Sequence, residues 1–162
     1  MHHLTRTVST LLLVGVALLL KACNATEPIG EFSSALGKLV RSESTRRIDL
    51  STIYPLAWEE LFAFGPYSRR EDSCKTLQLG WFACRTTLPA EVNESEYVLV
   101  FRLKSKVIHI EHHSRANGDF YSQDNVRPQP ILRKAAVFSV MLVSNRSPQG
   151  QRWYLLEHQG IQ

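Results

Sequence analysis

The sequence predicts an α+β fold, in which a mostly antiparallel sheet of about five to seven strands carries two packed helices. Residues 97–103 and 107–113 are rich in strand-forming side chains and are joined by three residues, which is typical of a β-hairpin. Apolar residues in 29–41 recur at helical spacing. The segment 135–143 is apolar throughout, as expected of a central strand buried on both faces. We therefore expect one α+β domain over residues 29–160.

Residues 1–22 have the pattern of a secretory signal peptide. Arg6 supplies a basic start without any acid, and the apolar run 11–20 leads into small residues at a cleavage point. This run is shorter than the roughly 20 residues that span a bilayer. The segment is therefore predicted to direct export and to be removed.

Two cleavage routes remain open. The tetrapeptide Leu20-Lys21-Ala22-Cys23 resembles the bacterial lipobox, which is cut before a cysteine that receives a lipid, although Lys21 stands where that motif usually has a small or uncharged residue. In the other route, signal peptidase cuts after Ala25. The first route is favoured, and it predicts a membrane partner reached through a lipid on Cys23.

The lipidated chain is expected at the periplasmic face of the outer membrane. Residues 23–28 would form a tether, and Asn24 is not the Asp that retains bacterial lipoproteins in the inner membrane. Loss of Arg6 and Lys21 lowers the formal net charge from +4 to +2. So small a charge does not predict a nucleic-acid partner, which requires a clustered basic face.

The cysteines support export. Either cleavage route leaves Cys74 and Cys84 as the remaining pair of three cysteines, and disulfides persist in an oxidising compartment. A disulfide between them would stabilise the fold by about 2–3 kcal/mol, because the closed loop lowers the conformational entropy of the unfolded chain. The alternative is a pair of buried free thiols.

The first half of the domain alternates strands and helices. Residues 48–52 predict a strand that ends before Pro55, and 58–64 predict another, with a helical turn at 57–62 as the alternative. Gly65-Pro66 then breaks the pattern.

A helix is predicted over 69–79. Ser68 and Glu71 have the spacing of a capping box, and Gly80 provides a C-terminal stop. Residues 81–86 predict a strand that carries Cys84.

The C-terminal third is predicted to be mostly strand and loop. Asn117-Gly118 marks a turn, 119–134 predict a long loop or a short edge strand, and 152–158 predict the last strand.

His109, Glu111 and His113 fall on one face of the second hairpin strand, because side chains alternate along a strand. Imidazole and carboxylate groups could together bind zinc or copper. No fourth ligand is identifiable, so we favour a solvated face with Ile108 and Ile110 turned to the core. No cofactor is predicted.

Residues 58–67 (WEELFAFGPY) and 115–120 (RANGDF) resemble motifs of a family of small bacterial exported or lipid-anchored proteins of uncharacterised function. In that family a Trp-acidic pair leads a strand that ends in Pro-Tyr, and a helix follows. The resemblance covers most of 47–143. It implies an α+β domain and export, and it implies no activity.

Four residues in these motifs are candidates for a ligand site or for structural roles. Trp58 is expected in the core, as large aromatic residues usually are. Tyr67 would either pack on the following helix or line a pocket. Arg115 and Asp119 would form an ion pair that holds the loop after the hairpin, or they would supply the polar part of a ligand site.

No catalytic motif is recognisable: the chain has no nucleophile elbow, no phosphate-binding glycine loop and no H-E-x-x-H. The favoured function is therefore a non-catalytic binding or interaction domain of the envelope, with an envelope protein as partner and no small-molecule ligand identified. A metal-binding protein that uses the His109 strand ranks second. A secreted hydrolase with an unfamiliar site ranks third.

Overall fold

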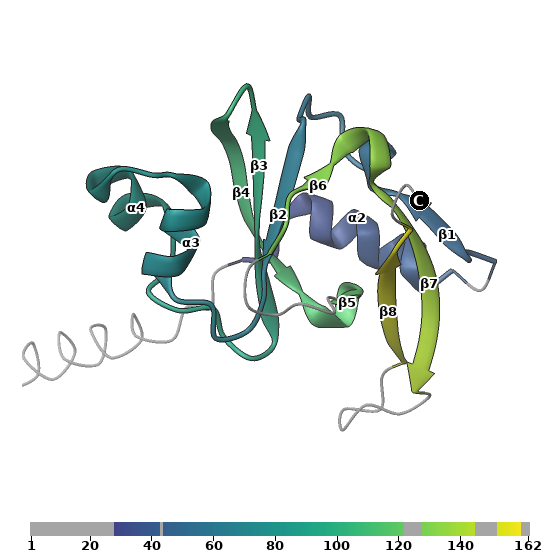
Figure 1. Ribbon diagram of the computed structural model, residues 1–162. Coiled ribbons are helices and arrows are strands. Elements are labelled where there is room, and N and C mark those ends of the chain that lie inside the picture. Colours follow the sequence, from purple (N-terminus) through teal and green to yellow (C-terminus); the bar gives the residue numbers. More distant parts are fainter. Residues whose placement is uncertain (1–27, 43, 122–127, 145–151, 160–162) are drawn as a thin grey trace, which may run out of the picture.

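A computed structural model of the chain describes residues 28–42, 44–121, 128–144 and 152–159. These ranges contain three α-helices and two four-stranded sheets, which confirms the predicted α+β class and divides the strands between two sheets (Figure 1). The predicted signal peptide at 1–22 and the predicted lipidation site at Cys23 lie outside the described residues.

The first sheet contains the predicted hairpin and is antiparallel throughout. Lys104 and Ser105 join the two hairpin strands, and both have positive φ angles, 48° and 62°, as a two-residue type I′ turn requires. The order of strands is β4-β3-β2-β6. Their bounds are β2 (Glu60–Phe64), β3 (Glu96–Leu103), β4 (Lys106–Ser114) and β6 (Ile131–Leu132).

The second sheet has the order β1-β7-β8-β5, and β5 is parallel to β8 while the other pairs are antiparallel. Short 3₁₀ turns precede or follow several strands. The bounds are β1 (Arg47–Asp49), β5 (Asp119–Tyr121), β7 (Val137–Ser144) and β8 (Trp153–His158), with the turns η2 (Leu50–Thr52), η3 (Arg115–Asn117) and η4 (Arg133–Ala135).

Two strands of this sheet differ from their prediction. The first ends at Asp49 because its carboxylate accepts a 2.9 Å hydrogen bond from the Ser51 amide and starts a 3₁₀ turn. β7 is central, between β1 and β8, but it is not buried on both faces: Phe138 and Val140 are buried, whereas Met141, whose side chain points to the opposite face, is 39% exposed. The described core covers one face of this sheet, as is common for antiparallel sheets.

Helix α2 (Glu31–Val40) lies between the two sheets, whereas α3 (Arg70–Leu77) and α4 (Trp81–Thr87) lie on the opposite face of the first sheet (Figure 1). Side chains of β3 contribute to the hydrophobic clusters on both faces of the first sheet. Leu99 and Phe101 belong to the cluster around α2, and Val98 and Val100 belong to the cluster around α3. The first sheet is therefore covered on both faces.

The α3–α4 segment corrects two predictions. Arg69, not Ser68, is the N-cap residue of α3, and it makes no side-chain capping bond, so the capping box does not form. Gln78, in the left-handed conformation, ends α3, and Gly80 is instead the N-cap of α4. The strand predicted at 81–86 is wrong, because those residues are helical.

A disulfide joins Cys74 of α3 to Cys84 of α4, with their Cα atoms 5.6 Å apart. The predicted pairing is confirmed.

Candidate functional site

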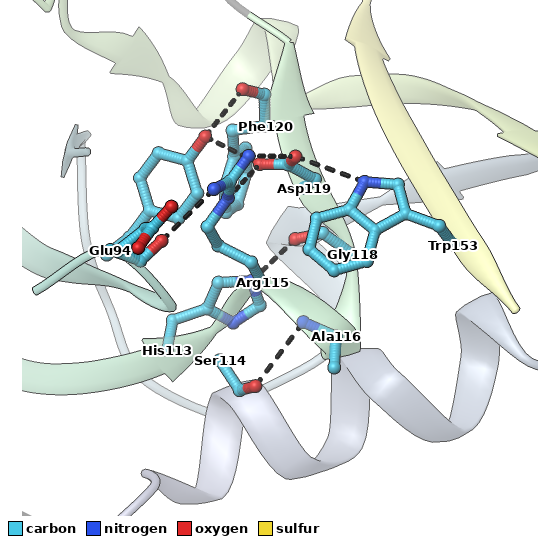
Figure 2. Close-up of polar contacts among 10 residues, drawn as sticks. Glu94, His113, Ser114, Arg115, Ala116, Gly118, Asp119, Phe120 and Trp153 are labelled. Carbon is cyan, nitrogen blue, oxygen red and sulfur yellow. Dashed lines mark hydrogen bonds and ion pairs between the residues drawn. The ribbon is translucent and has the colours of Figure 1, made fainter. Parts of the chain in front are cut away.

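Asp119, at the start of β5, is the centre of a buried polar network between the two sheets (Figure 2). Its Oδ1 accepts hydrogen bonds from Arg115 Nε at 3.0 Å and from the Tyr97 hydroxyl at 2.8 Å. Its Oδ2 accepts from Arg115 Nη2 at 2.7 Å and from Trp153 Nε1 at 3.2 Å. The carboxylate is thus held by donors from η3, β3 and β8.

Arg115 is fixed on three sides. Besides the ion pair with Asp119, its Nη1 donates to the Glu94 carbonyl at 3.0 Å, and its guanidinium lies 5.2 Å from the centre of the Trp153 ring. The Tyr97 hydroxyl oxygen lies 2.8 Å from both Asp119 Oδ1 and the Phe120 carbonyl oxygen, and burial raises the pKa of this phenol. The structure therefore places Arg115 and Asp119 in the ion pair that holds the loop after the hairpin, and their polar atoms are satisfied within the protein.

His113 lies beside this network and is fully buried. Its Nε2 donates to the Gly118 carbonyl at 2.7 Å, and its ring lies 5.3 Å from that of Phe120. Its Nδ1 has no hydrogen-bond partner among the described residues. Burial lowers the pKa of His113 from 6.5 to about 4, so the neutral ring is the stable form in the folded protein.

Glu111 caps helix α2 from the neighbouring strand. Its carboxylate accepts hydrogen bonds from the amides of Ser33 at 2.8 Å and Phe32 at 3.3 Å, where the helix dipole favours negative charge. His109 Nε2 lies 3.1 Å from Glu111 Oε2.

The expected solvated face is therefore wrong: His109, Glu111 and His113 point toward the layer that contains α2. Ile108 is 38% exposed, while Ile110 packs against the cluster around α3. The described residues contain no group of three or more His, Cys, Asp or Glu side chains placed to hold a metal ion.

Trp58 and Tyr67 have opposite environments. Trp58 is 2% exposed, packs edge-to-face on Phe101 at 5.7 Å, and has the Arg133 guanidinium over its ring. Tyr67 is 62% exposed and has a φ of 64°, in a turn closed by Ser68 N and Gly65 O at 3.1 Å. An exposed aromatic residue in this left-handed conformation is strained, and such strain concentrates at functional surfaces.

A groove of about 950 Å³ lies between α3 and β2, with Tyr67 at its margin. Phe62 and Phe64 form its apolar floor from β2. Arg69, Asp72 and Lys75 contribute charges from α3 and its N-cap. The groove thus combines an aromatic floor with charged side chains on its α3 wall.

Helix α4 is the most exposed aromatic feature of the described chain. None of its residues is buried, and Trp81 and Phe82 are 74% and 73% exposed. The Arg85 guanidinium lies 5.5 Å from the Trp81 ring centre. The strand predicted at 81–86 hides this surface, because Trp81 and Phe82 are strong strand formers. The signal against a strand is that apolar and polar residues do not alternate there.

Within the described ranges, no helix is long and apolar enough to cross a membrane. Comparison of the chain with protein-family models, curated proteins and solved structures found no match.

Proposed function

We propose that the chain is exported, is anchored to the envelope by a lipid on Cys23, and acts as a non-catalytic binding domain. Its binding surface is the side of the molecule formed by α3 and α4, here called the α3–α4 surface. The signal-like residues 1–22 and the lipobox-like tetrapeptide support export and anchoring. The Cys74–Cys84 disulfide supports an oxidising compartment.

The observation that carries this proposal is the exposed pair Trp81 and Phe82 on a helix fastened by a disulfide. A seven-residue helix is too short to be stable alone in water, and α4 contributes no buried side chain to the fold. The disulfide therefore holds in place an element whose aromatic side chains face outward. Exposed aromatic residues rimmed by polar ones mark interaction sites.

The buried polar clusters of the described residues have structural partners within the fold. The carboxylates of Asp119 and Glu111 accept hydrogen bonds from groups that hold the fold together, and His113 is enclosed by aromatic rings. These groups support the scaffold on which the α3–α4 surface is presented.

A photo-reactive amino acid placed at position 82 in cells tests the proposal. Phe82 is exposed and its replacement should not disturb the core, so the label would report what contacts α4. The same label at Val143, an exposed apolar residue of the other sheet, is the matched control.

We expect an adduct from position 82 in the envelope fraction and none from position 143. Equal labelling at the two positions, or no adduct at position 82, would contradict a specific binding role for α4.

A further inference from the structure

We propose that the partner of α4 is the anionic lipid surface of the membrane that carries the chain, so that the helix forms a second, reversible contact beside the lipid anchor. This inference rests on the proposed function, because it names the partner of the α3–α4 surface.

The side chains of α4 match the layers of a membrane interface. Trp81 is suited to the headgroup region, where Trp is enriched because its ring is apolar and its N–H is polar. Phe82, equally exposed, can enter the boundary with the acyl chains. Arg85 lies over Trp81 and can meet lipid phosphates.

The charge of this helix favours an anionic surface. Residues 81–87 (WFACRTT) include Arg85 and no carboxylate. Lys75, in the last turn of α3, is exposed and adds a second cation next to the disulfide that joins the two helices, while the exposed carboxylates of α3, Glu71 and Asp72, lie in its first turn, at the other end of the helix. Basic side chains close to the membrane are attracted to anionic headgroups by about 1 kcal/mol each.

The proposed anchor would keep the domain near the membrane. Cys23 precedes Pro28, where the described chain begins, by five residues, and five extended residues span at most about 18 Å. A contact made within such a short tether is effectively intramolecular, so a weak affinity suffices.

The small size of α4 favours lipid over a protein partner. Each partner in a stable protein complex typically buries about 800 Å², so a protein would have to cover α3 as well as α4, whereas the exposed aromatic pair is confined to α4. A tethered membrane contact has no such requirement, because the anchor already supplies the affinity.

Tryptophan quenching by brominated lipids tests the inference. The mature full-length protein, purified from its native membrane, is reconstituted into vesicles of phosphatidylethanolamine and phosphatidylglycerol with brominated acyl chains. Trp81 is the exposed tryptophan, whereas Trp58 is buried and Trp153 is partly covered within the Asp119 network. We expect quenching that Trp81→Phe abolishes, because this change removes the reporter and keeps an aromatic side chain.

Two further variants distinguish docking of α4 on the bilayer from simple closeness of the anchored domain to the membrane. Phe82→Ser should weaken the contact about ten-fold, since it removes a side chain that buries a large apolar area. Val143→Ser, on the other sheet, is the matched control and should leave quenching unchanged. Neither residue contributes to the core, so both variants should fold.

The outcomes distinguish this inference from the proposed function. Unquenched Trp81, together with a protein adduct from position 82, would overturn lipid docking and leave the binding role standing. A Trp81 blue shift that appears without vesicles and grows with protein concentration would assign the surface to a second copy of the chain, which also overturns it. If Trp81 were not quenched and position 82 gave no adduct, both proposals would be contradicted.

Discussion

The Arg115 guanidinium and the Asp119 carboxylate form a bidentate ion pair across the 3₁₀ turn η3, with N–O distances of 3.0 and 2.7 Å. The pair fixes the chain where it leaves the first sheet at β4 and enters the second at β5. Tyr97 and Trp153 bond to the same carboxylate, so one side chain connects β3, η3 and β8.

Asp119→Ala is expected to lower the free energy of unfolding by about 3 kcal/mol, because it leaves buried donors without their acceptor. Urea denaturation measures this loss. Glu60→Gln is the control: Glu60 makes a single 3.4 Å contact with Arg102 and is partly exposed, so its loss should cost less than about 1 kcal/mol. Equal losses in the two variants would contradict a central role for Asp119.

Gly30→Ala is expected to destabilise the protein because a Cβ at this position would meet the Glu111 carboxylate that caps α2. Gly80→Ala is the matched control, since Gly80 is also an N-cap in extended conformation but has nothing within 4 Å of the added carbon. Gly30→Ala should cost about 1 kcal/mol more than Gly80→Ala.

The same measurement in a Glu111→Ala background isolates the clash. Without the carboxylate, Gly30→Ala should cost no more than Gly80→Ala. If its extra cost persisted, the contact with Glu111 would not be the cause.

Removal of the disulfide is expected to release α4 before the rest of the fold. The Cys74→Ala/Cys84→Ala variant should lose about 2–3 kcal/mol of stability, and α4 amides should exchange with solvent much faster, because the helix has no buried side chain to hold it. Hydrogen exchange measures this, with the buried strand β3 as the internal reference. Persistent protection of α4 amides in the variant would show that contacts other than the disulfide hold this helix.

Stability is expected to fall as the pH is lowered from 6.5 to about 4, owing to His113. The unfolded chain takes up a proton below pH 6.5, whereas burial keeps the folded His113 neutral until about pH 4, so protonation favours unfolding across this window. The full loss is about 3 kcal/mol.

Urea midpoints measured across this window test the effect. Groups that face His113 include Tyr97, Phe120 and the nearby Asp119, and Asp119 opposes the shift. His113→Gln should flatten the pH dependence, whereas His109→Gln, on the same strand but partly exposed, should keep it. An unchanged slope in His113→Gln would assign the effect to other groups.

Local patterns predicted the elements whose side chains alternate or recur regularly. The hairpin of β3 and β4, helix α2 and strand β8 all occupy the expected segments, because apolar periodicity and turn chemistry agree there. The disulfide was also predictable, from the cysteine count and the expected compartment.

Elements determined by contacts distant in sequence were not predictable. Helix α4 has strong strand formers in Trp81 and Phe82, and its position depends on a disulfide to α3. The face of β4 was misassigned because the polar groups of Glu111 and His113 are satisfied by α2 and Gly118, which no local pattern reveals. The Arg115–Asp119 pairing could be suggested from its spacing, but the links to Tyr97 and Trp153 could not.

The most direct test of the central claim, an exported domain anchored beside a membrane, is the intact mass of the mature protein from its native envelope. The mature protein is expected to begin at Cys23 and to carry acyl chains there, with Cys74 and Cys84 resistant to alkylation until a reductant is added. A mature chain that begins at Thr26, or that retains residues 1–22 without acylation, would contradict the anchor. Free thiols at Cys74 and Cys84 in the unreduced protein would contradict the oxidising compartment.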